Sequence, residues 1–159
     1  MSTRRIAIFG NSGSGKSTLA RKLSAELGVP MLELDTIVWE PGKIAVERPR
    51  ATVLADLNTF IESNDEWVVE GCYGDILEST LEKCTEIYFL NPGADACSAN
   101  NRRRPWEPHK YDSPEAQDAM LENLIGWVRG YYTRDDGWSL AAHRRLFDSF
   151  KGRKTEVGS

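Results

Sequence analysis

The sequence contains few cysteines, and their spacing fits neither a disulfide framework nor a metal site. The three are Cys72, Cys84 and Cys97, an odd number with no Cys-x-x-Cys spacing and no histidine close to them in sequence. Such a set is typical of free thiols in a reducing compartment, and it argues against structural zinc. We therefore expect a cytoplasmic protein.

Long apolar segments and an excess of positive charge are also missing. The N-terminal apolar run covers only residues 6–9, and no stretch approaches the ~18 apolar residues that a membrane span needs. Lysine and arginine number 20 against 24 acidic residues, which gives a net charge of -4. These absences argue against a membrane protein and against a protein that coats nucleic acid, so we expect a small-molecule partner.

Apolar runs alternate with amphipathic segments over the first 100 residues. The runs predict strands at residues 6–9, 31–35 and 85–90, and residues 66–74 as a further strand that runs into a glycine turn. Helical spacing extends from about Gly15 to a stop signal at Gly28, and again over residues 53–61. Strands that alternate with helices predict a parallel sheet with right-handed crossovers, and 159 residues fit one domain. Residues 153–157 are the candidate for a fifth strand.

Beyond residue 100 the sequence becomes basic and is interrupted by prolines. A Ser-Pro pair at residues 113–114 then predicts the start of a helix with a broad apolar face, which continues to Tyr131 and Tyr132. These tyrosines pack either in the core, as aromatic stripes on helices usually do, or against a nucleobase. Two isolated histidines, His109 and His143, are expected to be structural or to face solvent.

A glycine-rich loop follows the first predicted strand and precedes the first predicted helix. Its sequence, GNSGSGKST, matches the phosphate-binding pattern G-x-x-x-x-G-K-[ST]. Glycines let backbone amides wrap around a phosphate, and the helix that starts near Gly15 adds its positive end. Lys16 is expected to reach the β- and γ-phosphates, and Ser17 to ligate Mg²⁺. We therefore expect ATP and Mg²⁺ as cofactors, bound by Gly10, Asn11, Ser12, Gly13, Ser14, Gly15, Lys16, Ser17 and Thr18.

Two acidic residues end predicted strands, on the edge of the sheet where α/β proteins bind ligands. Asp35 ends the run 31–35, and its carboxylate is expected to accept a proton from an acceptor hydroxyl or to hold a metal-bound water. Glu70 follows the apolar part of the third strand and completes a predicted metal site with Ser17 and Asp35. The alternatives are that Asp35 caps the next turn and that Glu70 makes a surface salt bridge.

Three consecutive arginines, Arg102, Arg103 and Arg104, precede a proline-broken segment. They are expected to close over the phosphates and neutralise transition-state charge, with Arg102 and Arg103 as catalytic residues and Arg104 as a substrate contact. Only one or two of three successive residues point the same way in a helix, and a solvated basic turn is the alternative. We name residues 102–137 the lid segment, with Lys110 as a further candidate.

These segments together resemble a known family. The run GNSGSGKSTLARKLSAELGVPMLELDTIVWEPG, with WVVEGCYG and IYFLNP, is similar to adenylate-kinase-like proteins often labelled DNA topology modulation proteins, which are relatives of shikimate and nucleoside-monophosphate kinases. The resemblance implies a three-layer α/β/α P-loop fold with a parallel sheet of four to five strands. It also implies an acceptor-binding region after the second strand and an arginine-bearing lid after the fourth.

The resemblance also implies roles for individual residues. Asp35 matches the acidic position that contacts magnesium-bound water and the acceptor in shikimate kinase, and Trp39 lies where acceptor contacts are expected. Gly71 and Tyr73 belong to the turn after the third strand, which contacts the acceptor in related kinases. This turn reads Gly-Cys-Tyr-Gly where shikimate kinase has three glycines, which argues against shikimate itself. Glu70 stands where nucleoside-monophosphate kinases commonly have Asp.

The sequence therefore predicts a kinase that moves the γ-phosphate of ATP to a small acceptor. The acceptor is a nucleoside, a nucleotide or a hydroxyl compound of the kind that shikimate kinase uses. Two alternatives remain: a nucleotide-dependent regulatory or DNA-associated ATPase, and a kinase for the 5′ hydroxyl of a polynucleotide. The acidic net charge and the lack of a recognisable DNA-reading motif argue against the first of these.

Overall fold

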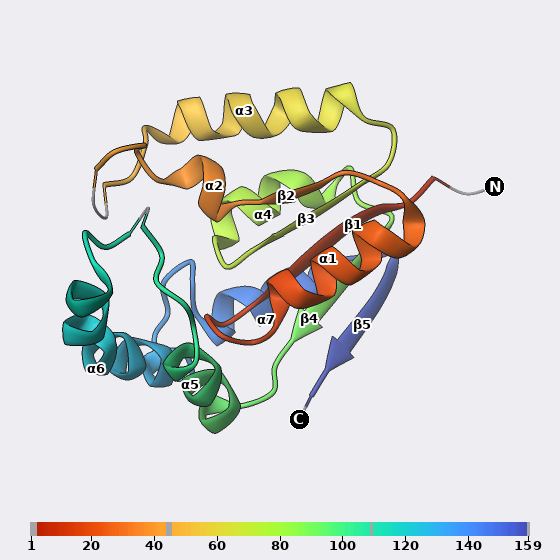
Figure 1. The fold of residues 1–159 in the computed structure, drawn as a ribbon. Coiled ribbons are helices and arrows are strands. Elements are labelled where there is room, and N and C mark those ends of the chain that lie inside the picture. Colours follow the sequence, from red (N-terminus) through yellow and green to blue (C-terminus); the bar gives the residue numbers. More distant parts are fainter. Residues whose placement is uncertain (1–2, 44–45, 109, 159) are drawn as a thin grey trace.

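A five-stranded parallel sheet forms the centre of the structure, a computed structural model that describes residues 3–43, 46–108 and 110–158 (Figure 1). The strands are β1 (Arg5–Gly10), β2 (Met31–Glu33), β3 (Trp67–Gly71), β4 (Glu86–Leu90) and β5 (Arg153–Val157). Their order is β2-β3-β1-β4-β5, and every neighbouring pair is parallel. The predicted sheet is confirmed, with residues 153–157 as its fifth strand. His109, predicted to be structural or solvent-facing, lies outside the described residues.

Helices cover both faces of the sheet. They are α1 (Lys16–Leu27), α2 (Asp35–Val38), α3 (Arg50–Ser63), α4 (Gly74–Leu81), α5 (Ala94–Arg102), α6 (Pro114–Gly130) and α7 (Leu140–Ser149). On one face α1 packs Ala20 against Ile8 of β1. On the other, Phe9 and Phe89 of the sheet join the apolar side chains of α3, α4 and α7 in one core. The three-layer α/β/α architecture is therefore confirmed.

The central strands read as continuous apolar runs because helices bury both of their faces. Ile6, Ala7, Ile8 and Phe9 of β1 are all 0% exposed, and every residue of β3 is buried. In contrast, all five residues of the edge strand β5 are exposed. This difference explains why β5 has a weak sequence signal, since an exposed edge strand needs no apolar run.

The second strand is shorter than predicted, and Asp35 does not belong to it. Leu34 adopts helical backbone angles, with φ -57° and ψ -30°, and its carbonyl accepts hydrogen bonds from the amides of Ile37 and Val38. Its own amide donates to the carbonyl of Glu70 at 2.9 Å. Leu34 thus ends the strand and begins a helical turn, so the predicted strand 31–35 is wrong at its end. Asp35 instead lies in the first turn of α2.

Helix α5 is not predicted by the sequence pattern. Its nine residues, ADACSANNR, contain no leucine, isoleucine or valine, and therefore give no apolar stripe. The helix starts directly after the turn that closes β4, and Cys97, Ser98 and Asn101 are its buried residues. It packs against α6, whose N-terminus is capped as predicted, because the Ser113 hydroxyl accepts from the amide of Ala116 at 3.0 Å.

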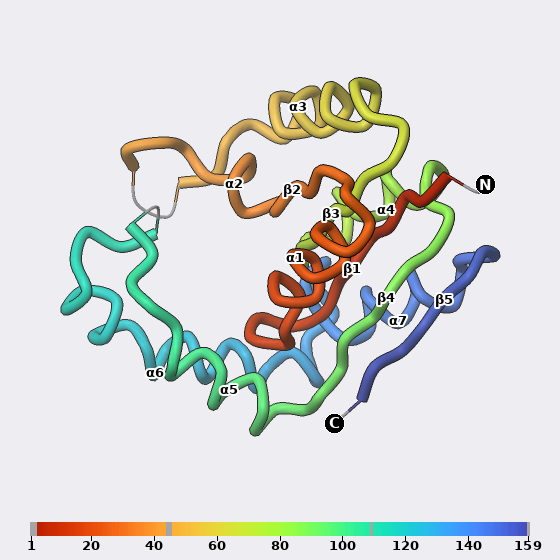
Figure 2. The backbone as a smooth tube through the Cα atoms, turned by 45° about the vertical axis from the view of Figure 1, so that its right-hand side comes forward, coloured from red at the N-terminus to blue at the C-terminus, as the bar shows by residue number. Residues whose placement is uncertain are grey.

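The carboxyl ends of the central strands lie between two groups of helices. Figures 1 and 2 show α2 and α3 on one side of this edge and α5 and α6 on the other, in both views. The loop after β1, the first turn of α2 and the turn after β3 all lie at this edge. Within the described part of the chain, no helix has both the length and the apolar character needed to cross a bilayer.

Candidate active site

The glycine-rich loop connects β1 to α1 and has the geometry of a phosphate-binding loop. Gly13 and Gly15 adopt left-handed backbone angles, with φ values of 80° and 98°. Only glycine adopts these angles without strain. At Gly15 no side chain caps the start of α1, so the first amides of the helix and its positive dipole end are available to an anion.

Two side chains in this loop fit a bound phosphate. The Lys16 ammonium donates to the carbonyl of Asn11 at 2.7 Å and so lies folded across the loop. The Ser14 hydroxyl is buried and has no hydrogen-bond partner among the described residues. A buried polar atom without a partner is costly, and a phosphate oxygen would supply the missing hydrogen bond. The geometry therefore agrees with the phosphate-binding role that the sequence predicts.

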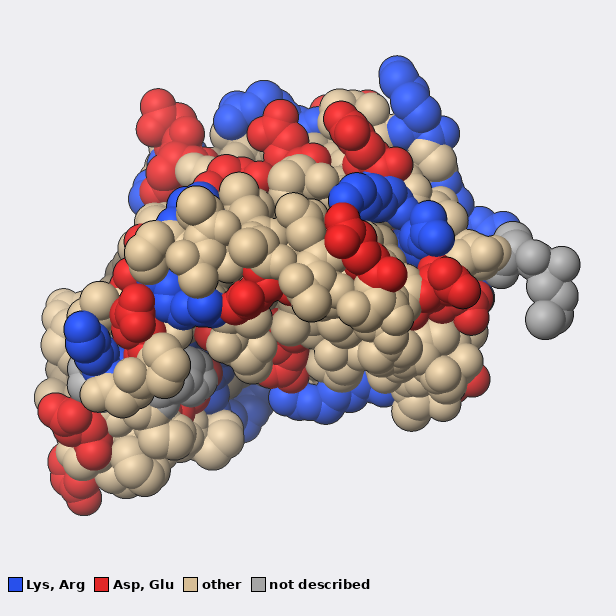
Figure 3. Space-filling model, turned by 90° about the horizontal axis from the view of Figure 1, so that it is seen from above, with Lys and Arg blue, Asp and Glu red and all other residues tan. Residues whose placement is uncertain are grey.

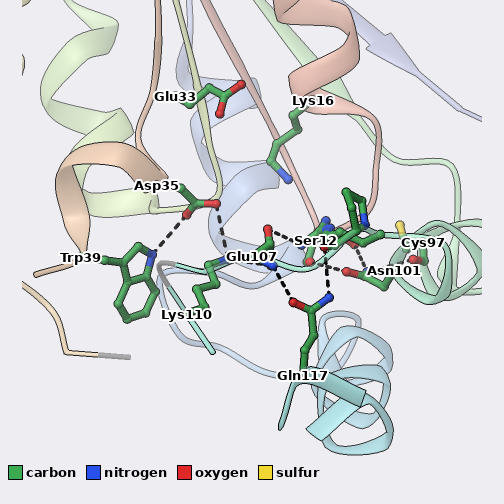
Figure 4. A network of polar contacts seen from close by, with 12 residues as sticks. Ser12, Lys16, Glu33, Asp35, Trp39, Cys97, Asn101, Glu107, Lys110 and Gln117 are labelled. Carbon is green, nitrogen blue, oxygen red and sulfur yellow. Dashed lines mark hydrogen bonds and ion pairs between the residues drawn. The ribbon is translucent and has the colours of Figure 1, made fainter. Parts of the chain in front are cut away.

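Two asparagines of helix α5 hydrogen-bond to the phosphate-binding loop, and the sequence does not predict these contacts. The Asn101 amide accepts from the Ser12 hydroxyl at 3.1 Å and donates to the Ser12 carbonyl at 3.1 Å (Figure 4). Asn100 donates to the carbonyl of Gly13 at 2.8 Å. A Cβ atom on Gly13 would lie 2.4 Å from the carbonyl oxygen of Cys97. In the sequence, the only sign of these contacts is the Asn-Asn pair before the arginines, and this pair matches no known motif.

Asp35 lies opposite the loop and is bound by three side chains. The Tyr73 hydroxyl donates to its Oδ1. The Trp39 indole nitrogen also lies 3.5 Å from Oδ1, and the Lys110 ammonium is 3.4 Å from Oδ2 (Figure 4). Burial acts to raise the pKa of Asp35, but Lys110, Tyr73 and Lys16 outweigh it and lower the pKa below its usual value. The carboxylate is therefore charged. No side-chain hydrogen bond caps the described helix α2, which argues against the alternative that Asp35 caps this turn.

Glu70 lies one residue before the end of β3, close enough to Lys16 and Asp35 for their charges to act on it. Its side chain is 4% exposed, and burial raises its pKa to about 7, with further increases from Asp35 and Glu33. The Lys16 charge and the nearby Ser17 hydroxyl act in the opposite direction. The alternative of a surface salt bridge is wrong, because the carboxyl is buried and forms no ion pair within the described ranges.

The three arginines point to different partners. Arg102, the last residue of α5, pairs with Glu122 of α6 at 2.7 Å, and both side chains are largely exposed. Arg103 donates to the Oδ1 atom of Asn100 at 2.6 Å, next to the phosphate-binding loop. Arg104 lies 3.6 Å from Glu107. The structure thus separates the three cations, and it is Arg103 and Arg104 that lie beside residues of the candidate site.

Lys110 is the lid-segment cation that approaches Asp35. The carboxylate of Glu107 lies 3.9 Å from Lys110 and also pairs with Arg104, so one acid holds both cations. The backbone amide of Glu107 donates to the Gln117 side chain at 2.7 Å, which ties this loop to α6 (Figure 4). Sequence alone does not pair Lys110 with Asp35, because 75 positions separate the two residues.

The turn after β3 packs tightly against Leu34, the residue that precedes Asp35. A Cβ atom on Gly71 would lie 2.7 Å from Cδ1 of Leu34, so only glycine fits there. Tyr73 is 4% exposed and packs edge-on against Trp138 with ring centroids 6.3 Å apart.

Tyr131 is fully buried, which confirms that it belongs to the core. The three cysteines are free, as predicted.

A cleft of about 460 Å³ opens beside the phosphate-binding loop. Gly15 and Thr18 form one wall, Leu90 and Val157 at the ends of β4 and β5 form another, and Asn100 contributes from α5. Its volume lies within the range of small-ligand sites. Because the cleft adjoins the loop on the side away from Asp35, it suits the nucleoside part of a nucleotide.

Comparisons with known proteins show the fold. A sugar kinase from Janibacter sp. HTCC2649 shares 14% identity with a TM-score of 0.55, over 99% of this chain and 86% of that one. A gluconokinase from Sinorhizobium meliloti 1021 shares 18% identity with a TM-score of 0.57, over 98% and 82%. The chain has the fold of P-loop kinases.

A third solved structure has the same fold but an unknown role. An uncharacterized protein from Eubacterium ventriosum ATCC 27560 shares 16% identity with a TM-score of 0.52, over 99% of this chain and 90% of that one. No protein-family model matches the sequence, and the search of curated proteins gives no match. The comparisons therefore support the kinase-type fold, whereas the resemblance to DNA topology modulation proteins stays a prediction.

Proposed function

We propose that the protein is an ATP-dependent kinase that transfers the γ-phosphoryl group to a hydroxyl of a small acceptor. The observation that carries this proposal is the charged carboxylate of Asp35, which faces the lysine of a phosphate-binding loop. A carboxylate in this position can accept the proton of an attacking hydroxyl, while the loop holds the transferred group. The kinases among the solved structures with this fold support the same reaction class.

The chain's own residues would act mostly by positioning and charge neutralisation. Amides of residues 13–17 and the Lys16 ammonium would bind the β- and γ-phosphates. Arg103, Arg104 and Lys110 are the cations available to offset charge that builds up during transfer. Asp35 would orient the acceptor hydroxyl and take its proton as the new bond to phosphorus forms and the bond to ADP breaks.

The residues around Ser17 suit a magnesium ion. Its hydroxyl lies next to the buried carboxyl of Glu70, and Asp35 is close enough to Glu70 to raise the pKa of that group. One hydroxyl and one or two carboxylates are a typical protein contribution for Mg²⁺, which keeps water and phosphate oxygens as its other ligands. Ser17 and Glu70 would therefore hold the ion, with Asp35 reaching its water. When bound, Mg²⁺ neutralises phosphate charge.

The acceptor site would be formed by Asp35, Trp39, Tyr73 and Lys110. An indole ring beside a carboxylate and an ammonium suits a small molecule that carries several hydroxyl groups. Nucleosides, nucleotides and hydroxy acids remain candidate acceptors. Sugars and sugar acids join them, because two of the solved structures are described as a sugar kinase and a gluconokinase.

The charge distribution on the face over α3 supports a small acceptor over a polynucleotide. Basic and acidic side chains are intermixed on the face over α3 (Figure 3), where Arg48 pairs with Asp56 at 2.7 Å and Arg50 with Asp75 at 3.0 Å. A surface that binds a nucleic acid backbone usually concentrates positive charge.

The test is transfer of label from γ-labelled ATP to a panel of nucleosides, nucleotides, sugars and hydroxy acids, with single-stranded oligonucleotides as a separate arm. We expect one class of small acceptor to be labelled, and Asp35→Asn to slow this transfer by about 10²- to 10⁴-fold with little change in ATP affinity. Lys16→Ala should abolish the reaction, and Asp148→Asn, an exposed change on α7, should leave it unaltered.

Three results would contradict the proposal. Hydrolysis of ATP without any labelled product would favour the regulatory ATPase, and labelling of oligonucleotides alone would favour the polynucleotide kinase. Equal losses of transfer and ATP affinity in Asp35→Asn would point to a metal-binding or structural role for this residue.

A further inference from the structure

A buried histidine lies behind the acceptor turn, which we define as residues 71–74. His143 of α7 is 0% exposed, and burial lowers its pKa to about 4, so the ring is neutral near pH 7. Nε2 lies 2.9 Å from the carbonyl oxygen of Cys72, and Nδ1 lies 2.7 Å from the hydroxyl of Tyr131. Because a carbonyl only accepts, Nε2 carries the proton and Nδ1 accepts from Tyr131.

The two partners of His143 belong to two segments that border the candidate site. Cys72 directly precedes Tyr73, whose hydroxyl donates to Asp35. Tyr131 directly follows α6, at the C-terminal end of the lid segment's helix. One neutral imidazole therefore joins the acceptor turn to the end of the lid helix, and the turn carries a direct contact to the proposed catalytic carboxylate.

A second contact joins the same two segments. The amide of Gly74 donates to the carbonyl of Gly137 at 2.9 Å. A Cβ atom on Gly74 would lie 2.3 Å from that carbonyl oxygen, so the two backbones are in close contact. The acceptor turn is thus fixed at both Cys72 and Gly74, and Tyr73 projects from between these two fixed points.

We propose that His143 is a positioning residue for the acceptor step: its bond to Cys72 fixes the acceptor turn and so holds the Tyr73 hydroxyl on Asp35. The inference rests on the proposed function, because it gives His143 a role at the same acceptor site. His143 does not touch Asp35. It acts through the backbone of Cys72 and the side chain of Tyr73, and Tyr131 fixes the ring by donating to Nδ1.

The test compares two substitutions of similar volume. His143→Gln keeps an N–H group that can donate to the Cys72 carbonyl, whereas His143→Met keeps the bulk without a donor. The readout is the titration midpoint of the Asp35 carboxyl, followed by carbon-13 NMR on protein labelled at aspartate side chains. Lys110, Lys16 and Trp39, the other groups that lower the pKa of Asp35, are unchanged in both variants.

We expect the Asp35 midpoint to depend on the donor at position 143. Tyr73→Phe, which removes the hydrogen bond directly, should raise the midpoint by about one pH unit. His143→Met should raise it by about half a unit, and His143→Gln should stay close to the wild-type value. Tyr88→Phe is the matched control, because it removes a tyrosine hydroxyl that bonds Glu86 and should leave Asp35 unchanged.

The proposal is overturned if folded His143→Met keeps the wild-type midpoint of Asp35 while Tyr73→Phe raises it. If His143→Met does not fold, His143→Leu replaces it, since it also lacks a donor for the Cys72 carbonyl. An unchanged midpoint there overturns the proposal equally. These titrations need no acceptor, so a failure of the proposed kinase activity would be seen separately, as an absence of labelled product.

Discussion

Asp35 and Glu70 lie at the same edge of the sheet, but their surroundings favour opposite charge states. Lys110, Tyr73 and Lys16 lower the pKa of Asp35 against the effect of burial, whereas burial raises the pKa of Glu70 to about 7. Two carboxyl groups whose pKa values differ in this way can perform two different tasks, proton acceptance and metal binding. Binding of a divalent cation would ionise Glu70 fully, so ion binding and proton release should be coupled.

Glu70 should make the free protein less stable as the pH rises. Its pKa is about 7 in the folded chain against an ordinary value of 4.5, so the folded state binds the extra proton. The proton bound to Glu70 contributes to the free energy of unfolding. This contribution is fully present below about pH 4.5 and is lost as the pH rises through about 7. Glu70→Gln removes this loss and should stabilise the protein at pH 8 by up to about 3 kcal/mol relative to pH 4.5.

Denaturant unfolding of wild type and variant, each measured across this pH range without nucleotide, checks the difference. Glu82→Gln, at an exposed position after α4, is the control and should give a flat difference curve. A flat curve for Glu70→Gln would mean that Glu70 has the same pKa in the folded and the unfolded chain.

Single residues were predictable where a local pattern specifies them. The motif around Lys16 is contiguous, and Asp35 and Glu70 follow apolar runs, so their common edge follows from strand direction. The partners of Asp35 were not predictable to the same degree. Tyr73 and Lys110 approach it from segments 38 and 75 positions away, and only the folded backbone brings these groups together.

At the scale of elements, α5 is the part of the site that sequence reasoning misses. A nine-residue helix without large aliphatic side chains has no hydrophobic periodicity, and its role depends on two amides that hold another loop. The same applies to the end of β2, where Leu34 still donates to Glu70 of the sheet while its carbonyl accepts the first bonds of a helical turn, from Ile37 and Val38.

Asn101→Ala should weaken ATP binding more than it weakens the fold. The change leaves the Ser12 hydroxyl and carbonyl without their α5 partners, at a cost of about 1 to 3 kcal/mol that falls partly on the phosphate-binding loop. We expect the Kd for ATP to rise by about tenfold in calorimetric titration. Asn123→Ala, at an exposed position on α6, is the control. Unchanged ATP affinity in Asn101→Ala would mean that the loop holds its shape without α5.

At the scale of the whole molecule, the lid segment is bonded to both ligand-binding regions. Before the lid, Asn100 and Asn101 hold the phosphate-binding loop. At its other end, Gly137 accepts from the acceptor turn, and Val128 accepts from the Asn11 side chain at 3.0 Å. The alternation of strands and helices predicts the fold itself, but not these connections, because they join loops that have no pattern of their own.

The junction between Gly74 and Gly137 should be sensitive to a single methyl group. Gly74→Ala brings a Cβ atom to 2.3 Å from a backbone oxygen, and we expect a loss of about 1 to 3 kcal/mol in the free energy of unfolding. Gly126→Ala, inside α6 with no atom within 4 Å of the new methyl, should instead stabilise by up to about 1 kcal/mol. Urea unfolding of both variants tests the contrast, and similar effects would argue against a close contact.

The two edges of the sheet differ in length and in charge. β2 has only three residues, and β5 displays Arg153, Lys154 and Glu156 along an exposed edge. Short or charged edge strands discourage pairing with strands of other molecules, because a docked strand would have to desolvate those charges. The charged residues that give β5 a weak sequence signal therefore also protect the open sheet from edge-to-edge aggregation.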